Sequence, residues 1–280
     1  MNIKNTLKQS VFGMLTAVAG NEERRVRVPV LSGLCRGMRL ELDLLTQVEP
    51  AYFYGTYDRA VLGSLQSVIK PGWTVWDCGI YLGFYTCFFA RQVGAGGRCI
   101  AFEPDPRNLR RAKTNVALNG FRHVSFEQLA IAGVSGKIEF VFSGNTNSHI
   151  KGVYVGTSMA DYQGREVVSS TEFVNSASLG DLLQRPDLAR PHLIKIDIEG
   201  AELDVLSSSK PEAWKYRPLL LVELHNPQCD SALWDFASRF GYKLKNCETL
   251  EPIIERNQVC GTVLCSPRDI TLSTPPDINR

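Results

Sequence analysis

Short apolar runs, each with an acidic residue at or near its end, recur along this chain and constrain its fold more than any other feature. They read TVWDCG at 74–79, GRCIAFEP at 97–104, HLIKIDIEG at 192–200 and PLLLVELH at 218–225. Near-continuous apolar runs of this length are typical of parallel strands that are covered on both faces. Helical segments lie between them, such as 106–120, which ends in a glycine. The repeated strand–helix–strand units predict a doubly wound α/β domain with a mostly parallel sheet and helices on both faces.

The N-terminal segment has two other patterns. Residues 26–48 alternate apolar and polar side chains, which predicts a β-hairpin. Before them, apolar residues recur every three or four positions and predict an amphipathic helix that packs on the domain: Ile3, Leu7, Val11, Leu15 and Val18. This apolar stretch is interrupted by polar residues and is too short to span a bilayer, so we expect no stable membrane insertion.

These patterns divide the chain into three parts. We expect a helix and hairpin over 1–50 that pack on the core, the α/β domain over 51–266 and a loose tail over 267–280. Within the α/β domain, residues 143–165 are polar, rich in glycine and serine, and without periodicity. A loop of that length predicts a lid or a binding loop.

Composition excludes some classes of partner. The chain has 31 basic and 29 acidic residues and a net charge of +2, so we expect no nucleic-acid partner. Its eight cysteines include no C-x-x-C pair, which argues against a zinc cage. Their irregular spacing favours reduced thiols and a cytoplasmic protein. Nothing in the sequence indicates an oligomeric state.

Carboxylates end most of the apolar runs. In an open parallel sheet, ligands bind at the carboxyl ends of the strands, so the last residue of each run is a candidate for function. These residues are Asp77, Glu103, Asp197 and Glu223. Burial of an unpaired carboxylate is costly, so their recurrence at strand ends indicates a binding site.

The first of these strand ends distinguishes between cofactors. A nicotinamide-binding turn reads G-x-G-x-x-G and places a pyrophosphate at a helix N-terminus. Here the spacing is D-x-G-x-x-x-G, and Asp77 would repel a pyrophosphate. Glu103, at the end of the second run, is placed to accept hydrogen bonds from both hydroxyls of a ribose. The pattern predicts an adenosine ligand with a cationic tail and no phosphates, a description that fits S-adenosylmethionine.

Several motifs carry a resemblance to a known family. In chain order, VWDCGIYLGFYT, AFEPDP, LAIAGVSG, KIDIEGAE and VELH resemble the FkbM-type S-adenosylmethionine-dependent methyltransferases over about residues 52–226. The resemblance implies a Rossmann-like methyltransferase fold for the α/β domain and methylation of a hydroxyl of a sugar or secondary metabolite. It also implies that Asp77, Gly79 and Glu103 contact the cofactor and that Asp197 lies beside the methyl group.

The first loop departs from the family pattern, which commonly reads G-A-N-x-G. Here it reads Gly79-Ile80-Tyr81-Leu82-Gly83. Only the two glycines must be small, because they let backbone approach the cofactor. We expect Ile80 and Leu82 to point into the packing between sheet and helix, and Tyr81 to face the cleft. The full set of predicted cofactor contacts is Asp77, Gly79, Ile80, Tyr81, Gly83, Glu103, Pro104, Gln128, Ala130 and Asp197.

Methyl transfer to a hydroxyl needs a base that takes the proton as the new bond forms. Asp197 and His225 are the candidates, with a lean to Asp197 from its position in the family motif. His225 ends its strand just before Asn226-Pro227, and its ordinary pKa suits the task. Asp197, Glu199, Glu223 and His225 are also compatible with a Mg²⁺ site, but we favour a mechanism without a metal.

Other functions stay open at this point. The leading expectation is an O-methyltransferase whose partner is a small-molecule or glycan hydroxyl acceptor. The alternatives are an N-methyltransferase and a non-catalytic sensor or scaffold that binds an adenosine ligand. Asp77 argues against a nicotinamide-dependent oxidoreductase.

Overall fold

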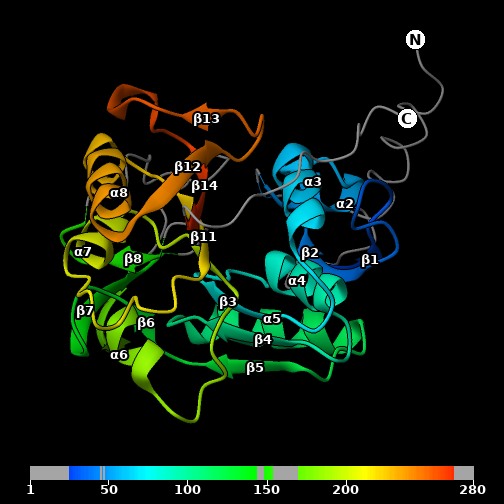
Figure 1. The fold of residues 1–280 in the computed structure, drawn as a ribbon. Helices are drawn as coiled ribbons and strands as arrows, with labels where there is room; N and C mark the ends of the chain where they lie inside the picture. Colours follow the sequence, from blue (N-terminus) through cyan, green and yellow to red (C-terminus); the bar gives the residue numbers. More distant parts are fainter. Residues whose placement is uncertain (1–24, 45, 47, 144–147, 154–169, 268–280) are drawn as a thin grey trace.

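The protein was analysed as a computed structural model that describes residues 25–44, 46, 48–143, 148–153 and 170–267. The predicted N-terminal helix, nearly all of the predicted tail and most of the predicted loop at 143–165 lie outside the described residues. Figure 1 shows the arrangement of the helices and strands.

The described residues form an eight-stranded mixed sheet in the order β13-β12-β14-β11-β10-β3-β4-β5. Its parallel part consists of β3 (Thr74–Cys78), β4 (Arg98–Phe102), β5 (Val124–Glu127), β10 (Leu193–Ile196) and β11 (Leu219–Glu223). The antiparallel edge consists of β12 (Tyr242–Asn246), β13 (Pro252–Ile253) and β14 (Thr262–Pro267). The strand order reverses between β3 and β10, and the parallel core confirms the predicted α/β class.

Helices cover both faces of this sheet because successive strand residues point to opposite sides. Val75 of β3 packs into the apolar layer under α3 (Arg59–Val68), α4 (Phe84–Val93) and α5 (Pro106–Leu118). Trp76 packs into the layer under α6 (Leu179–Gln184), α7 (Glu202–Ser207) and α8 (Pro227–Phe240). A 3₁₀ turn, η1 (Arg256–Gln258), precedes β14. The two layers lie on opposite sides of the sheet (Figure 1).

The predicted hairpin is present as β1 (Arg25–Pro29) and β2 (Arg39–Asp43), an antiparallel pair followed by α2 (Glu49–Tyr54). It is attached to α5 and its C-cap through the side chains of Arg111, Asn115 and Asn119. Asn115 accepts a hydrogen bond from the backbone N–H of Glu41 (2.6 Å) and donates one to the carbonyl of Leu82 (2.8 Å). The hairpin is therefore connected to the loop that follows β3.

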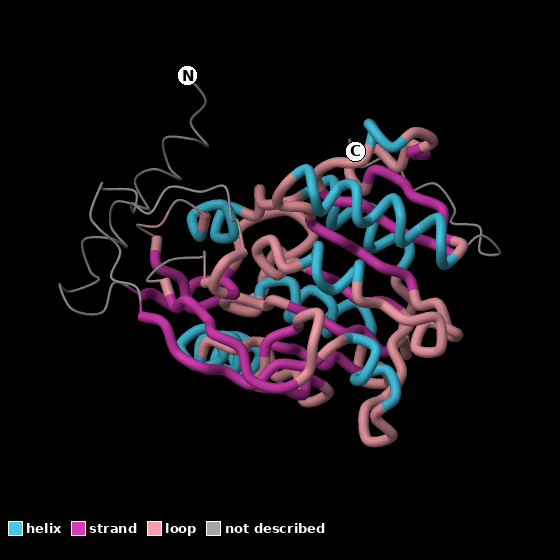
Figure 2. Tube along the Cα trace, turned by 90° about the vertical axis from the view of Figure 1, so that its left-hand side faces the viewer, coloured by secondary structure: helices cyan, strands magenta, loops and turns pink. Residues whose placement is uncertain are grey.

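A second sheet differs from the sequence prediction. It contains β6 (Ala130–Ile131), β7 (Gly136–Phe142), β8 (His149–Ile150) and β9 (Ser170–Ala177) in the order β6-β9-β7-β8. Figure 2 views the molecule from the side on which this sheet lies in Figure 1. The predicted single strand HVSFEQLAIA is wrong, because the chain turns at Gln128 and β6 pairs with β9 instead of continuing β5. The sequence analysis also missed β9 and α6.

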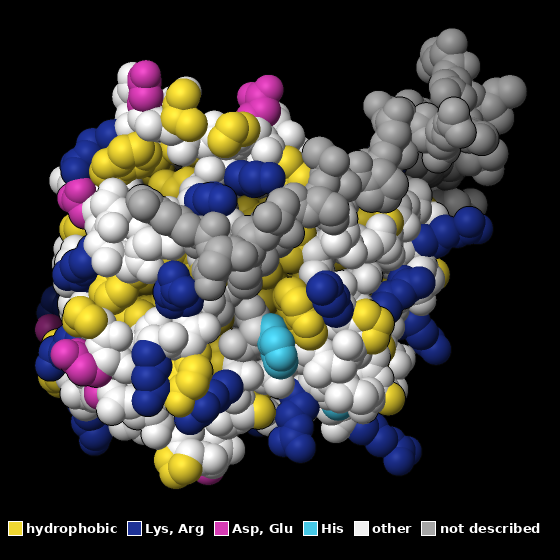
Figure 3. Space-filling model, viewed as in Figure 1, with side chains coloured by type: hydrophobic (Ala, Val, Ile, Leu, Met, Phe, Trp, Pro, Cys, Tyr) yellow, Lys and Arg dark blue, Asp and Glu magenta, His cyan; other side chains and the backbone are white. Residues whose placement is uncertain are grey.

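The surface charges and the cysteines of the described residues resemble those of an ordinary globular domain. On the face shown in Figure 3, lysine and arginine side chains alternate with hydrophobic and uncharged ones and form no continuous basic surface among the described residues. All eight cysteines fall in the described part of the chain, and all are free thiols. Of the helices that the structure describes, none has both the length and the apolar character to cross a membrane.

Candidate functional site

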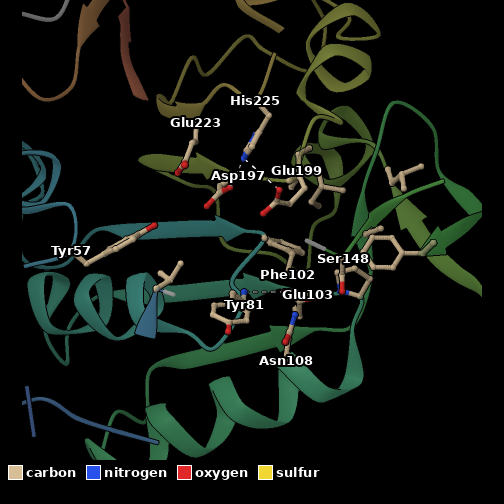
Figure 4. Close-up of a pocket in the computed structure, with 18 of the residues that line it drawn as sticks. Tyr57, Tyr81, Phe102, Glu103, Asn108, Ser148, Asp197, Glu199, Glu223 and His225 are labelled. Carbon is tan, nitrogen blue, oxygen red and sulfur yellow. Dashed lines mark hydrogen bonds and ion pairs between the residues drawn. The ribbon is translucent and has the colours of Figure 1, made fainter. Parts of the chain in front are cut away.

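A cavity opens at the carboxyl ends of β3, β4, β10 and β11, next to the reversal of strand order. Figure 4 shows that its polar side chains form two groups, with Glu103 and Asn108 at one end and Asp197, Glu199, Glu223 and His225 at the other. Apolar side chains line the space beside Glu103: Phe102, Pro104, Ala130, Ile131 and Phe140. The second sheet thus closes this side of the cavity.

Gly79 forms the floor between the two groups. Its φ is +80°, and a Cβ placed there would lie 1.7 Å from the carbonyl oxygen of Asp197. Its N–H donates to the carbonyl of Phe102 (3.1 Å), and the N–H of Asp197 donates to the carbonyl of Cys78 (3.1 Å). Only glycine fits at this junction of β3, β4 and β10, which leaves backbone open to the cavity.

Glu103 is a buried carboxylate that lines the cavity, with 4% of its surface exposed. The N–H of Asp105 donates to its Oε1 (2.9 Å), and the N–H of Tyr81 donates to its Oε2 (3.1 Å). Burial raises the pKa of Glu103 to about 8, against the opposing effect of these two hydrogen bonds and of a third from the side chain of Asn108. Both oxygens are oriented by backbone and retain lone pairs for ligand hydroxyls.

The other end of the cavity carries an ion pair. Lys195 is 3% exposed, and its Nζ lies 2.6 Å from Oδ2 of Asp197. Burial disfavours its charge, but Asp197, Asp77 and Glu223 outweigh this and raise the pKa of Lys195. One oxygen of Asp197 is therefore occupied by an ammonium, and its Oδ1 lies 3.6 Å from Nε2 of His225.

His225 is held by a carboxylate that the sequence analysis did not assign. Its Nδ1 lies 3.1 Å from Oε1 of Glu202, which is 0% exposed and also accepts the N–H of Ile198 (2.9 Å). Burial opposes the charged imidazolium, but Glu202, Asp197 and Glu199 outweigh it and raise the pKa of His225 to about 9. Glu202 orients the ring so that Nε2 points toward Asp197 and Glu199 (Figure 4).

Glu199 and Glu223 also line this end of the cavity. Burial, together with the neighbouring Asp197, raises the pKa of Glu199 to about 8. Asp197 is the main cause that raises the pKa of Glu223 to about 7, followed by burial. Glu199 also adopts a φ of +56°, an uncommon conformation for a residue other than glycine. Like charges held this close favour a cationic ligand.

The structure brings most of the predicted contacts to this cavity. The predicted residues that line it are Gly79, Tyr81, Glu103, Pro104, Ala130, Asp197 and His225. As expected, Ile80 and Leu82 are buried in the packing on the sheet, whereas Tyr81 lines the cavity.

Four predicted contacts do not reach it. Asp77 is fully buried beneath the loop, where Thr86 donates to its Oδ2 (2.6 Å) and its Oδ1 has no partner among the described residues. Burial raises the pKa of Asp77 to about 6. Ile80 packs against Leu109 and Ala112 of α5, Gly83 caps α4, and Gln128 is exposed at the turn after β5. Glu103 lines the cavity but Asp77 does not, so the two carboxylates do not flank one crevice.

Several lining residues were absent from the predicted contacts: Tyr52, Tyr57, Asn108, Ser148, Glu199 and Glu223. Glu199 and Glu223 were considered as possible Mg²⁺ ligands, and Glu223 also as a strand-end acid, but neither was predicted to contact the cofactor. Glu202 closes the motif KIDIEGAE, and that position was its signal. Tyr57 was considered only as a residue at the border of the cofactor, and Tyr52 had no signal, since it precedes the strands that build the site.

Asp197, Glu223 and His225 offer one ligand atom each, and these atoms lie within 4.8 Å of one another. The donor set does not suit Mg²⁺. That ion prefers oxygen ligands, whereas this set includes an imidazole, and Lys195 already places a positive charge on Asp197. The residues present therefore do not favour Mg²⁺ at this end of the cavity.

Comparison with known proteins gives a family. Residues 77–244, more than half of the chain, match the Methyltransferase FkbM domain. A curated relative, Methyltransferase 1 of Beauveria bassiana (strain ARSEF 2860), is 27% identical over 172 residues, which cover 58% of this chain and 66% of the relative's length.

Solved structures with a similar arrangement include a TehB-like SAM-dependent methyltransferase from Corynebacterium glutamicum. It has 12% identity and a TM-score of 0.43 and covers 78% of this chain and 92% of that one. The O-methyltransferase TomG from Streptomyces achromogenes, in complex with SAM, has 13% identity and a TM-score of 0.38. The match covers 74% of this chain and 78% of TomG. On the match over residues 77–244, this chain belongs to the FkbM methyltransferase family.

Proposed function

We propose that this chain is an S-adenosylmethionine-dependent O-methyltransferase that acts on a hydroxyl of a sugar or a secondary metabolite. The observation that carries the proposal is the division of one cavity into two ends. Glu103 is presented for a ribose at one end, and the pair of His225 and Glu202 stands beside Asp197 at the other (Figure 4).

The residues present fit the cofactor. Glu103 suits the two ribose hydroxyls, and the apolar side chains of Phe102, Pro104 and Ile131 suit an adenine ring. Asp197 and Glu199 supply negative charge where the cationic part would lie. Gly79 leaves the floor open between these regions.

When bound, S-adenosylmethionine supplies an electrophilic methyl group on a positively charged sulfur. We assign His225 as the base that takes the proton from the acceptor hydroxyl at its Nε2. Glu202 accepts the hydrogen bond from Nδ1–H, which sets the ring orientation and stabilises the imidazolium that forms. A cation in the cavity would lower the pKa of His225 toward neutrality.

Asp197 is the second candidate for the base. Lys195 occupies its Oδ2, so only Oδ1, on the side of His225, is left to accept a proton. In the arrangement that we favour, Asp197 contributes negative charge near the methyl group and stabilises the imidazolium once Nε2 of His225 has taken the proton.

A labelled-methyl transfer screen tests this function. The wild-type protein is incubated with labelled S-adenosylmethionine and a panel of glycosides, polyketide-like alcohols and matched amines. We expect transfer to at least one alcohol, and a fall of about 10²–10⁴-fold in turnover for His225→Gln at unchanged cofactor affinity. Transfer to amines alone would indicate an N-methyltransferase, and cofactor binding without any transfer would indicate a sensor. Full turnover by His225→Gln with a large loss in Asp197→Asn would reassign the base to Asp197.

A further inference from the structure

A buried cluster joins the N-terminal segment to the loop after β3. Glu49 of α2 is 0% exposed and Arg111 of α5 is 7% exposed by side chain. Arg111 donates to both oxygens of Glu49, with Nη2 to Oε2 at 2.6 Å and Nη1 to Oε1 at 3.0 Å. The hydroxyl of Tyr81 donates to Oε1 of the same carboxylate at 2.6 Å.

The cluster is costly to bury, and most of its polar atoms have partners, although Nε of Arg111 has none among the described residues. The N–H of Asp43 at the end of β2 also donates to Oε2 of Glu49 (2.6 Å), and Arg111 donates to the carbonyl of Glu41 (3.3 Å). A buried ion pair is weak evidence for stability, because apolar residues of similar size often serve as well. Tyr81 is the third member of the cluster and also lines the cavity, so the cluster can affect the cofactor site as well as stability.

Tyr81 is the link to the cavity. Its φ is +49°, a conformation that is uncommon for a bulky residue, so surrounding contacts must hold it there. Its hydroxyl is bound by Glu49 at one end, and its N–H donates to Oε2 of Glu103 at the other (3.1 Å). The guanidinium of Arg111 also lies over the Tyr81 ring, 5.5 Å from its centroid.

We propose that Glu49 and Arg111 are positioning residues of the cofactor site, which act through Tyr81 to hold the Glu103 carboxylate toward the ribose. The inference rests on the proposed function. It extends the site beyond residues 77–244, because Glu49 lies outside the segment that matches the family. The end of β2 and α2 are therefore part of the cofactor site, through Asp43 and Glu49.

Tyr81→Phe is the first test, because it deletes the hydrogen bond to Glu49 and the longer one that the hydroxyl accepts from Arg111 (3.5 Å), and leaves the ion pair intact. We expect the Kd for S-adenosylmethionine, measured by isothermal titration calorimetry, to rise about tenfold while the protein stays folded. Tyr85→Phe is the matched control. It deletes an equivalent bond from a tyrosine hydroxyl to the carboxylate of Asp58 (2.7 Å), which is not connected to Glu103, and its Kd should match that of the wild type.

Glu49→Gln and Arg111→Lys test the other two members. We expect KM for the cofactor to rise in each, with kcat and KM for the acceptor little changed, and we expect Glu49→Asp to recover part of the affinity. If one of these charge variants does not fold, the test rests on Tyr81→Phe, because that substitution keeps both buried charges.

The outcomes separate this inference from the proposed function. If the wild type binds S-adenosylmethionine and Tyr81→Phe binds it equally well, the cluster has only a structural role and the inference fails alone. If the wild type does not bind S-adenosylmethionine, both the inference and the proposed function are wrong. A higher Kd in Tyr81→Phe, with Tyr85→Phe unchanged, supports the inference.

Discussion

At the scale of single residues, Glu103 is the strongest test of the cofactor assignment. We expect Glu103→Ala to raise the Kd for S-adenosylmethionine tenfold or more, because the ribose would lose charge-assisted hydrogen bonds. Glu127→Gln is the control, since this acid also ends a strand but does not line the cavity. Calorimetry measures both, and equal affinity in Glu103→Ala and the wild type would contradict the assignment.

The pair of His225 and Glu202 makes a second prediction at this scale. His225 must be neutral to act as a base, and its pKa in the free protein is about 9. We therefore expect kcat/KM to rise with pH toward this value. Glu202 is the main group that raises this pKa, so Glu202→Gln should move the rise to lower pH. A pH–rate profile measures the shift, and an identical profile in Glu202→Gln would show that the pair does not set the base.

At the scale of elements, the junction of β3, β10 and the loop between β3 and α4 depends on Gly79. A methyl group at this position would collide with the Asp197 carbonyl, so Gly79→Ala should force the strand ends apart. We expect a loss of at least about 3 kcal/mol in the free energy of unfolding, together with weaker cofactor binding.

Gly120 supplies the matched control for this prediction. It follows α5 with a φ of +68°, but nothing lies within 4 Å of a Cβ built there. Gly120→Ala should therefore cost only about 1–2 kcal/mol of backbone strain and leave binding unchanged. Chemical denaturation and calorimetry measure both variants. Equal losses in the two would show that close approach at Gly79 has no special importance.

At the scale of the whole molecule, several buried groups bind protons more tightly in the folded state than in the unfolded chain. The pKa is raised to about 8 in Glu103 and in Glu199, to about 7 in Glu223, and to about 9 in His225. The native state holds these protons where the unfolded chain has released them. Their stabilising contribution is thus complete below the unfolded pKa and is lost as the pH rises through the folded value.

The ligand-free protein should therefore lose thermal stability from about pH 4.5, the ordinary pKa of a glutamate, up to about pH 9, the raised pKa of His225. S-adenosylmethionine should offset the loss, because its positive charge favours the deprotonated carboxylates, whereas S-adenosylhomocysteine, without the sulfonium charge, should offset it less. Differential scanning fluorimetry across this range measures the effect, with Glu199→Gln expected to flatten the slope. A ligand-free Tm that rises with pH would contradict the proton linkage.

The sequence predicted the site best where local pattern and topology coincide. Apolar runs and helical segments between them identified β3, β4, β10 and β11, and the residues directly after β4 and β10 are Glu103 and Asp197. Because the carboxyl ends of neighbouring parallel strands meet at one edge, these residues were expected to share a site, and both line the cavity. The break at Gln128 was missed, since a strand that changes sheets keeps the same apolar pattern.

By itself, the sequence determined the α/β class, the family and the acids at the strand ends, because these follow from local periodicity and short motifs. Only the tertiary structure decided which of those acids face the ligand. Asp77 turned out to be buried against Thr86, and the partners of Tyr81 and His225 proved to be Glu49 and Glu202, which come from other elements. Such pairings depend on how helices pack on the sheet, and packing between segments distant in the chain leaves no periodic signal in the sequence.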